Sequence, residues 1–160
     1  AVEISIGLIG IMALWLGIMK IAEASGLIRI IARALKPITV RLFPDVPADH
    51  PAIGSIVLNM AANMLGLGNA ATPLGLKAME ELQELNPKKD TATNAMVMFL
   101  AINTSSVQII VPATVVALMG VAASQIFIPT ILATLASTIT AIIMVKLLEK
   151  MKRFSVESES

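Results

Sequence analysis

Asparagine side chains recur inside residues 51–76, a stretch that contains no charged residue. Asn59 and Asn63 are four residues apart, so in a helix their amides project from one face. An amide buried in an apolar medium without a hydrogen-bond partner is energetically costly. These amides must therefore bond to a neighbouring helix, to exposed backbone or to a polar ligand. No acidic residue lies in the stretch, so coupling through a carboxylate is not expected here.

The same stretch contains residues that interrupt helices. Gly66 and Gly68 permit the chain to unwind. Pro73 removes a backbone donor and frees a carbonyl close after Asn69 and Thr72. Exposed backbone at membrane depth is tolerated only beside protein or a water-filled cavity, so the combination of amides and interruptions favours a site rather than a plain span.

A second polar cluster occurs in FLAINTSSVQIIVPAT, where Asn103, Thr104 and Gln108 precede Pro112. Two interrupted hydrophobic segments with uncharged polar groups are typical of a transporter's binding site near the middle of the bilayer. The alternative is helix packing, because polar side chains between membrane helices stabilise bundles by about 0.6 to 2 kcal/mol per hydrogen bond. From the residues alone both interpretations remain open.

Machinery for catalysis is not recognisable in the sequence. There is no cysteine, and the single histidine, His50, cannot form an imidazole cluster. No Ser/His/Asp set, metal-ligand motif or phosphate-binding loop is present. We therefore expect no enzyme, no metal site and no cofactor.

The composition indicates an integral membrane protein, since 56% of the 160 residues are hydrophobic and only 14% are charged. Residues 4–19, 51–76 and 91–145 form charge-free runs of 16, 26 and 55 residues. About 20 residues are enough to cross the hydrocarbon. The charged residues lie almost entirely between these runs, which argues against a nucleic-acid surface.

Basic residues constrain the path of the chain. Residues 20–41, 77–89 and 146–153 hold five, three and four Lys or Arg. If all three intervals face the cytoplasm, residues 91–145 leave and return with a turn near GVAASQ, and residues 51–76 return to the side that they left. As one helix these 26 residues would extend ~39 Å. We favour a re-entrant hairpin that turns at Gly66–Gly68; one crossing broken at the glycines is the alternative.

Other elements complete the expected fold. Arg29, Arg33 and Lys36 recur at helical spacing, which predicts a basic amphipathic helix in the headgroup plane that stops or kinks at Pro37. The alternative is a second spanning helix with snorkelled arginines. A charged helix over GLKAMEELQE is expected to stop at Asn86, before a proline, and residues 154–160 form a disordered tail. The fold class is thus all-α: a polytopic helical membrane protein with broken or re-entrant helices and an interfacial amphipathic helix.

Two long strings, HPAIGSIVLNMAANMLGLGNAATPLGLKAMEELQELNP and TNAMVMFLAINTSSVQIIVPAT, closely resemble the spore maturation protein A family of nucleoside-recognition, or gate, domains. With WLGIMKIAEASGL and LFPDVPADHPA upstream, the resemblance covers nearly the whole chain and implies a gate-type domain over residues 1–153. It also implies kinship with gate domains in concentrative nucleoside carriers and in the membrane part of ferrous-iron transporter B.

The resemblance implies a role in spore core dehydration where the host forms spores, movement of a small solute, and a similar second half, spore maturation protein B. It further leads us to expect an additional apolar segment before Ala1. Polar residues that match the family's strings are Asn59, Asn63, Asn69, Thr72, Asn103 and Thr104.

Together these features predict one half of a transporter or permease-like complex for a small polar solute in the bacterial cytoplasmic membrane. The other half is a B-type partner or a second copy. The alternative is a non-transporting structural subunit whose polar residues mediate packing and assembly. The candidate substrate-binding residues are Asn59, Asn63, Asn69, Thr72, Asn103, Thr104 and Gln108. The candidate hinge residues are Gly66, Gly68, Pro73 and Pro112.

Overall fold

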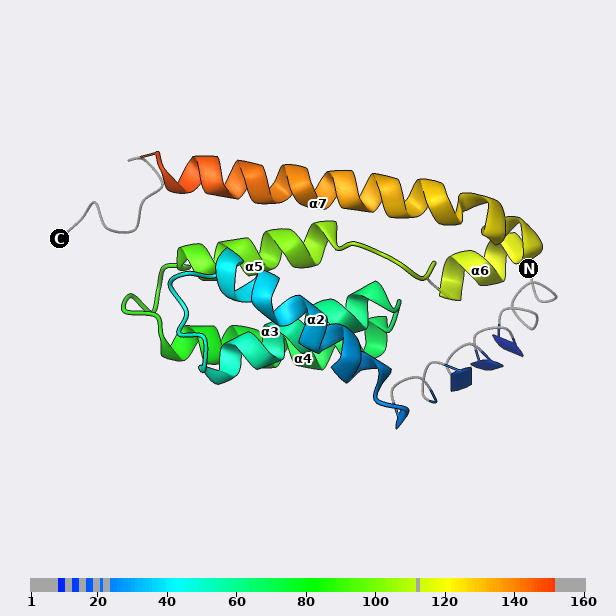
Figure 1. Ribbon diagram of the computed structural model, residues 1–160, viewed down its shortest axis with the longest axis horizontal. Coiled ribbons are helices and arrows are strands. Elements are labelled where there is room, and N and C mark those ends of the chain that lie inside the picture. Colours follow the sequence, from blue (N-terminus) through cyan, green and yellow to red (C-terminus); the bar gives the residue numbers. More distant parts are fainter. Residues whose placement is uncertain are drawn as a thin grey trace.

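The computed structural model describes residues 24–111 and 113–151, together with residues 9–10, 13–14, 17–18 and 21, but not the side chains of residues 68–70, 113–114, 117 and 121. Most of the charge-free run 4–19, Pro112 and the predicted tail at residues 154–160 lie outside the described residues. The described part contains helices and no strand, which confirms the all-α prediction. The helices are α2 (Leu27–Leu42), α3 (Pro51–Met64), α4 (Gly68–Glu84), α5 (Asn94–Ser105), α6 (Ala113–Met119), the 3-10 helix η1 (Gly120–Ile126) and α7 (Phe127–Glu149) (Figure 1).

Helices α3 and α4 form an antiparallel hairpin (Figure 1). Gly66 ends α3 in the left-handed region with φ of 72°. Its N–H donates to the Asn63 carbonyl at 2.9 Å, and the Leu67 N–H donates to the Ala62 carbonyl at 2.9 Å. These two bonds make a Schellman motif, in which glycine is favoured because it carries no Cβ. The chain therefore turns at the glycines, as the sequence predicts.

Helix α4 joins the polar and the charged stretches into one element of 17 residues. The sequence predicts a separate charged helix, but α4 continues past Pro73 without a break. Pro73 lies early in the helix, where it removes a single bond to the carbonyl four residues before it. The helix ends at Glu84, close to the predicted stop, and buried Asn86 then donates to the Thr91 carbonyl at 2.9 Å.

Helix α2 packs against α3 through Ile28, Ala32 and Thr39, which are buried. The sequence predicts that the helix stops or kinks at Pro37; it runs through Pro37 to Leu42, so it does not stop there. Pro37 is exposed, and its ring therefore points away from the α3 interface. Pro37 has no N–H, so one backbone hydrogen bond of the helix is lost and one carbonyl is left without its partner. The face that packs against α3 is not disturbed.

Helix α5 begins where Thr93 Oγ1 accepts from the Met96 N–H at 3.3 Å, and it ends at Ser105. Residues 106–111 are not helical, so the first of the two predicted passes is interrupted. Helix α6 and η1 follow, and the chain reverses at η1, which confirms the turn predicted near GVAASQ (Figure 1). Helix α7 then returns alongside α5.

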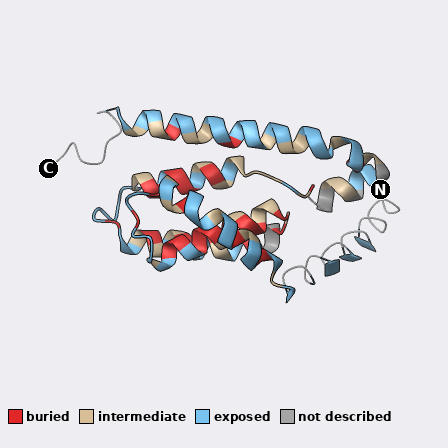
Figure 2. Cartoon of the chain, viewed as in Figure 1, coloured by how far each residue is buried: buried red, intermediate tan, exposed pale blue. Residues whose placement is uncertain are grey.

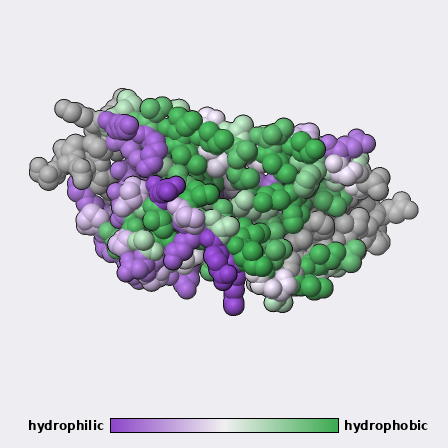
Figure 3. All heavy atoms as spheres, in the orientation of Figure 1, coloured by the Kyte–Doolittle hydropathy of each residue, from purple (hydrophilic) through white to green (hydrophobic). Residues whose placement is uncertain are grey.

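Helix α7 differs from the others in its surroundings. Within the described residues, the stretch Ala122–Glu149 is the one helix long and apolar enough to cross a membrane. Most of its side chains are exposed, including Ile128 at 66% and Leu132 at 61% (Figure 2). The largest fully buried side chains lie elsewhere, at Phe43, Phe99, Ile53, Ile56 and Leu82. Hydrophilic groups gather at the end of the molecule where α7 ends, beside a broad apolar surface (Figure 3).

Candidate functional site

The Asn59 side chain ties the two arms of the α3–α4 hairpin together. It is 1% exposed. Its Nδ2 donates to the Ala71 carbonyl of α4 at 2.7 Å, and its Oδ1 accepts from Asn63 Nδ2 at 3.3 Å. A fully buried amide with bonds to two partners has its desolvation offset within the chain.

Asn63 and Asn103 connect the two interrupted segments that the sequence singles out. Asn63 Nδ2 donates to Asn103 Oδ1 at 2.6 Å, although the two residues are 40 positions apart. Both side chains are only partly buried, in contrast to Asn59. Since each amide still has hydrogen-bonding capacity beyond these bonds, this pair could also bond to a ligand.

Gly75 in α4 permits the amides to approach this closely. A Cβ on Gly75 would lie 2.9 Å from Asn59 Nδ2 and 3.5 Å from Asn103 Nδ2. Contacts under 3.0 Å essentially never occur for real Cβ atoms, so a larger residue would displace the amide of Asn59. Gly75 is therefore part of the site, as the surface against which two asparagines pack.

The end of α3 also meets the interruption after α5 through the backbone. The N–H groups of Ile109 and Ile110 donate to the Met64 carbonyl at 3.0 and 3.1 Å. The last carbonyls of a helix have no partner within that helix. The non-helical residues after α5 thus supply donors that the end of α3 needs.

Helix α7 supports the same interruption from the other side. The Gln108 N–H donates to Thr134 Oγ1 at 3.2 Å. Thr138 Oγ1 donates to the Ser105 carbonyl at 3.2 Å, near the end of α5. The unwound backbone is therefore bonded to neighbouring helices, in keeping with the rule that irregular backbone in an apolar setting must be satisfied by protein or water.

A cavity of about 250 Å³ lies beside these groups. Helices α2, α3, α5 and α7 and the unwound residues all contribute to its lining, which is largely apolar. The volume corresponds to about eight waters at roughly 30 Å³ each. Its polar lining side chains are Asn59, Asn63, Asn103, Ser106 and Thr138. An apolar enclosure with a few convergent polar groups is the usual form of a small-molecule site.

This arrangement lies within a stretch that matches a known family. Residues 5–120 match the gate family, described as nucleoside recognition. The chain belongs to the gate family. It is also 51% identical over 147 residues to spore maturation protein A of Bacillus subtilis (strain 168), an alignment that covers 89% of this chain and 74% of that protein. No solved structure matches.

The matched gate region includes both interrupted segments and all three asparagines of the network, whereas α7 lies beyond it. Part of the cavity wall and two supporting threonines therefore come from outside the matched region.

The other predicted residues that the structure describes form no hydrogen bond with the three asparagines through their side chains. Thr72 and Thr104 are exposed, and neither lines the cavity. Gln108 contributes its backbone N–H to Thr134. The side chain of Asn69 is not described, and Pro112 lies outside the described residues. Gly68 opens α4, directly after the turn.

Four further residues belong to the site around the asparagines, although the sequence did not single them out: Gly75, Met64, Thr134 and Thr138. A glycine two residues after Pro73 was a possible signal, because a small residue in an apolar helix often marks a close approach. The Met64 carbonyl and the two threonines have no such signal. A sequence does not distinguish one carbonyl at a helix end from another, or one threonine hydroxyl in a membrane helix from another.

Proposed function

We propose that this chain is one half of a membrane transporter or permease-like complex for a small polar solute. The observation that carries the proposal is the 2.6 Å hydrogen bond between Asn63 and Asn103. It joins two interrupted helical segments at the lining of a partly open cavity. Amide groups placed at the junction of two broken helices suit recognition of a neutral or weakly charged solute by hydrogen bonding. We assign no catalytic step to this site.

Helix lengths support a re-entrant arrangement in a bilayer. Helix α3 has 14 residues and α5 has 12, which corresponds to rises of about 21 and 18 Å. Both are shorter than a hydrocarbon core of about 30 Å. If each enters from the charged end of the molecule, both end within the bilayer, at the level where the two asparagines meet. Helix α7 is long enough to cross.

The second half in this proposal is a partner similar to spore maturation protein B or another copy of the chain. The apolar side chains of α7 are exposed in this chain (Figure 2). This supports a setting in which lipid covers part of α7 and a partner subunit covers the rest. The similarity to spore maturation protein A supports a role in spore maturation. The location is then the bacterial cytoplasmic membrane, with several passes.

A second candidate function is that of a structural membrane subunit without transport. Asn59 favours it, because this amide is fully buried and bonded within the hairpin. Such bonds between helices stabilise a bundle whether or not a solute passes. The two functions therefore assign different roles to Asn59 and to the Asn63–Asn103 pair.

The pair can be tested by substitution in proteoliposomes that contain this chain with its B-type partner. Uptake of labelled uridine and of labelled dipicolinate would be measured for the unaltered chain, Asn63→Ala and Asn103→Ala. We expect uptake of at least one probe by the unaltered complex. Each substitution should abolish uptake while the complex remains assembled in size-exclusion chromatography, because it removes a group that contacts the solute.

Thr104→Ala is the matched control, since Thr104 follows Asn103 directly but is exposed and lies off the cavity. Its uptake should equal that of the unaltered chain. Uptake that survives both asparagine substitutions would overturn the transport proposal. Dissociation of the complex by both substitutions would instead favour the structural subunit.

A further inference from the structure

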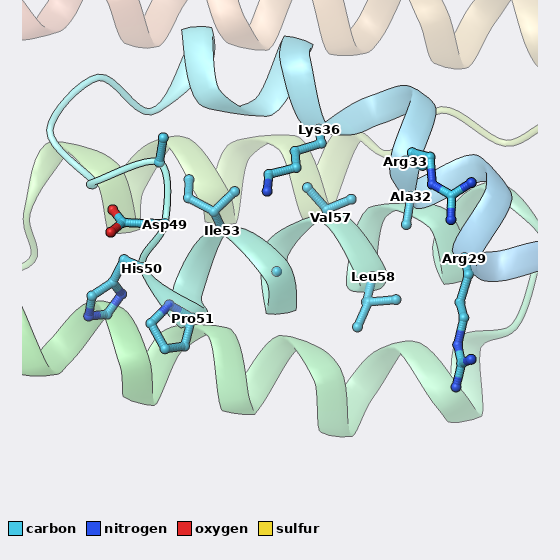
Figure 4. A pocket seen from close by; sticks show the side chains of 12 residues that line it. Arg29, Ala32, Arg33, Lys36, Asp49, His50, Pro51, Ile53, Val57 and Leu58 are labelled. Carbon is cyan, nitrogen blue, oxygen red and sulfur yellow. The ribbon is translucent and has the colours of Figure 1, made fainter.

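A second hollow lies on the other side of α3, between α2 and the first turns of α3 (Figure 4). This groove has a volume of about 540 Å³. Arg29, Arg33 and Lys36 line it from α2, and all three are exposed. None of them forms an ion pair with another residue that the structure describes. The groove thus presents three positive charges, and none of them is paired with the carboxylate of a described residue.

Among the lining residues that the structure describes, one negative group offsets this charge. This is Asp49, which lies with His50 and Pro51 at the opposite end of the groove from Arg29 and Arg33 (Figure 4). His50 Nδ1 is occupied, since it accepts from the Ala52 N–H at 3.2 Å. Three exposed like charges at helical spacing repel one another unless an anion lies between them.

The floor of the groove is apolar. Lys36 extends from α2 over Ile53 and Val57, and Leu58 lies toward the arginine end (Figure 4). On the outer surface of α2, Ile30 is exposed one position after Arg29. A helix that presents both cations and large apolar side chains is suited to the boundary between lipid headgroups and acyl chains.

We propose that this groove binds the phosphate group of an anionic phospholipid. Guanidinium groups match phosphate oxygens with paired hydrogen bonds, and the lysine adds a compact charge. The apolar floor accommodates the start of the acyl chains. Charge complementarity alone would suit any phosphate compound, but the apolar floor and the exposed Ile30 favour a lipid over a soluble one.

The groove runs along α3 from Pro51 to Leu58, a rise of roughly 10 Å. Its two ends differ in charge, because Arg29 and Arg33 lie at the Leu58 end and Asp49 lies at the Pro51 end (Figure 4). The proposed phosphate site is therefore at the Leu58 end of the groove.

The site is independent of the proposed transport, because no described residue lines both the groove and the asparagine cavity. Lipid binding at the groove can therefore be absent while transport persists, and transport can be absent while the lipid still binds. Its consequence is positional: a bound headgroup would fix the depth of α2 and, through the α2–α3 contact, of the hairpin.

The test uses the full chain in neutral detergent and calorimetric titration with dihexanoyl-phosphatidylglycerol and dihexanoyl-phosphatidylcholine. We expect at least tenfold tighter binding of the anionic lipid, weakened by salt. Each surface cation contributes about fivefold to the binding of anionic lipid, so Arg29→Gln, Arg33→Gln and Lys36→Gln combined should weaken binding roughly 100-fold. Arg41→Gln, on the same helix but outside the groove, should leave it unchanged.

A second variant tests the groove itself without changing charge. A Cβ on Gly54 meets no atom within 4 Å, so Gly54→Phe fills the groove while α3 remains helical. It should abolish the preference for the anionic lipid. Equal binding of the two lipids by the unaltered chain would overturn the proposal, as would a preference that survives either variant. Competition by glycerol 3-phosphate or inorganic phosphate at the same concentration as the lipid would assign the site to a soluble phosphate compound instead.

Discussion

The two interruptions in the apolar segments are built in different ways. The first, between α3 and α4, is short and is closed by bonds within its own hairpin: the two bonds around Gly66 and the Asn59 bond to α4. The second, at residues 106–111, contains no glycine and takes its bonds from elsewhere, namely from the end of α3 and from α7.

This difference separates a hinge that folds by itself from one that depends on its neighbours. The hairpin can form as a local unit, since its turn and its cross-link lie within 13 consecutive residues, 59–71. The hydrogen bonds of the second interruption, by contrast, are made to α3 and α7. Elements with few bonds of their own open at the lowest free energy, so we infer that movement in this molecule begins at residues 106–111.

Among the substitutions that test this difference, Asn59→Ala is expected to lower the free energy of unfolding most, because it removes the side-chain link between α3 and α4. It removes the 2.7 Å bond to the Ala71 carbonyl and leaves a void at a fully buried position. We expect a loss of about 2 to 3 kcal/mol in the free energy of unfolding. Unfolding in mixed micelles with increasing dodecyl sulfate measures it.

Thr104→Ala serves as the reference here, because an exposed position should change the free energy of unfolding by less than about 0.5 kcal/mol. If Asn59→Ala is no more destabilising than this reference, the hairpin is not held by its cross-link and the contrast between the interruptions is wrong.

A smaller loss is expected from Gly66→Val, which tests the turn rather than the cross-link. The left-handed backbone at φ of 72° disfavours residues with a Cβ by about 1 to 2 kcal/mol. Gly54→Ala is the control, since this helical glycine has open space around it and alanine should stabilise α3 slightly. Equal stability of Gly66→Val and the unaltered chain in the same micelle titration would exclude a glycine-dependent turn.

The sequence predicts the first interruption better than the second because the two depend on information at different range. A glycine that ends a helix acts on its own backbone, so the turn at Gly66 can be read locally. The bond between Asn63 and Asn103 joins residues 40 positions apart. The chemistry of each amide predicts that it needs a hydrogen-bond partner, but no local sequence pattern identifies which residue that partner is.

Helix boundaries show the same limit. Pro37 and Pro73 are helix breakers by local rules, yet α2 and α4 continue through both. Conversely, α5 stops at Ser105 without any glycine or proline at its end. Packing against other helices decides these cases: the Pro37 ring lies on an exposed face, and the bonds lost after α5 are replaced by the end of α3 and by α7.

The mildest change, Thr134→Val, removes support from the second interruption alone. Valine has the same shape but cannot accept the Gln108 N–H, so one backbone donor loses its partner. We expect a loss of about 0.5 to 1 kcal/mol, together with faster amide hydrogen exchange across residues 106–111. Exchange at the α3–α4 turn should be unchanged, because its bonds lie within the hairpin.

Thr140→Val is the matched control on the same helix, since the Thr140 hydroxyl donates to the Ala136 carbonyl within α7 and to no other described residue. It should leave exchange at both interruptions unchanged. If Thr134→Val instead accelerates exchange equally at both interruptions, they open as one cooperative unit. The Met64 carbonyl, which accepts from Ile109 and Ile110, would then couple the hairpin to the residues after α5 rather than merely border them.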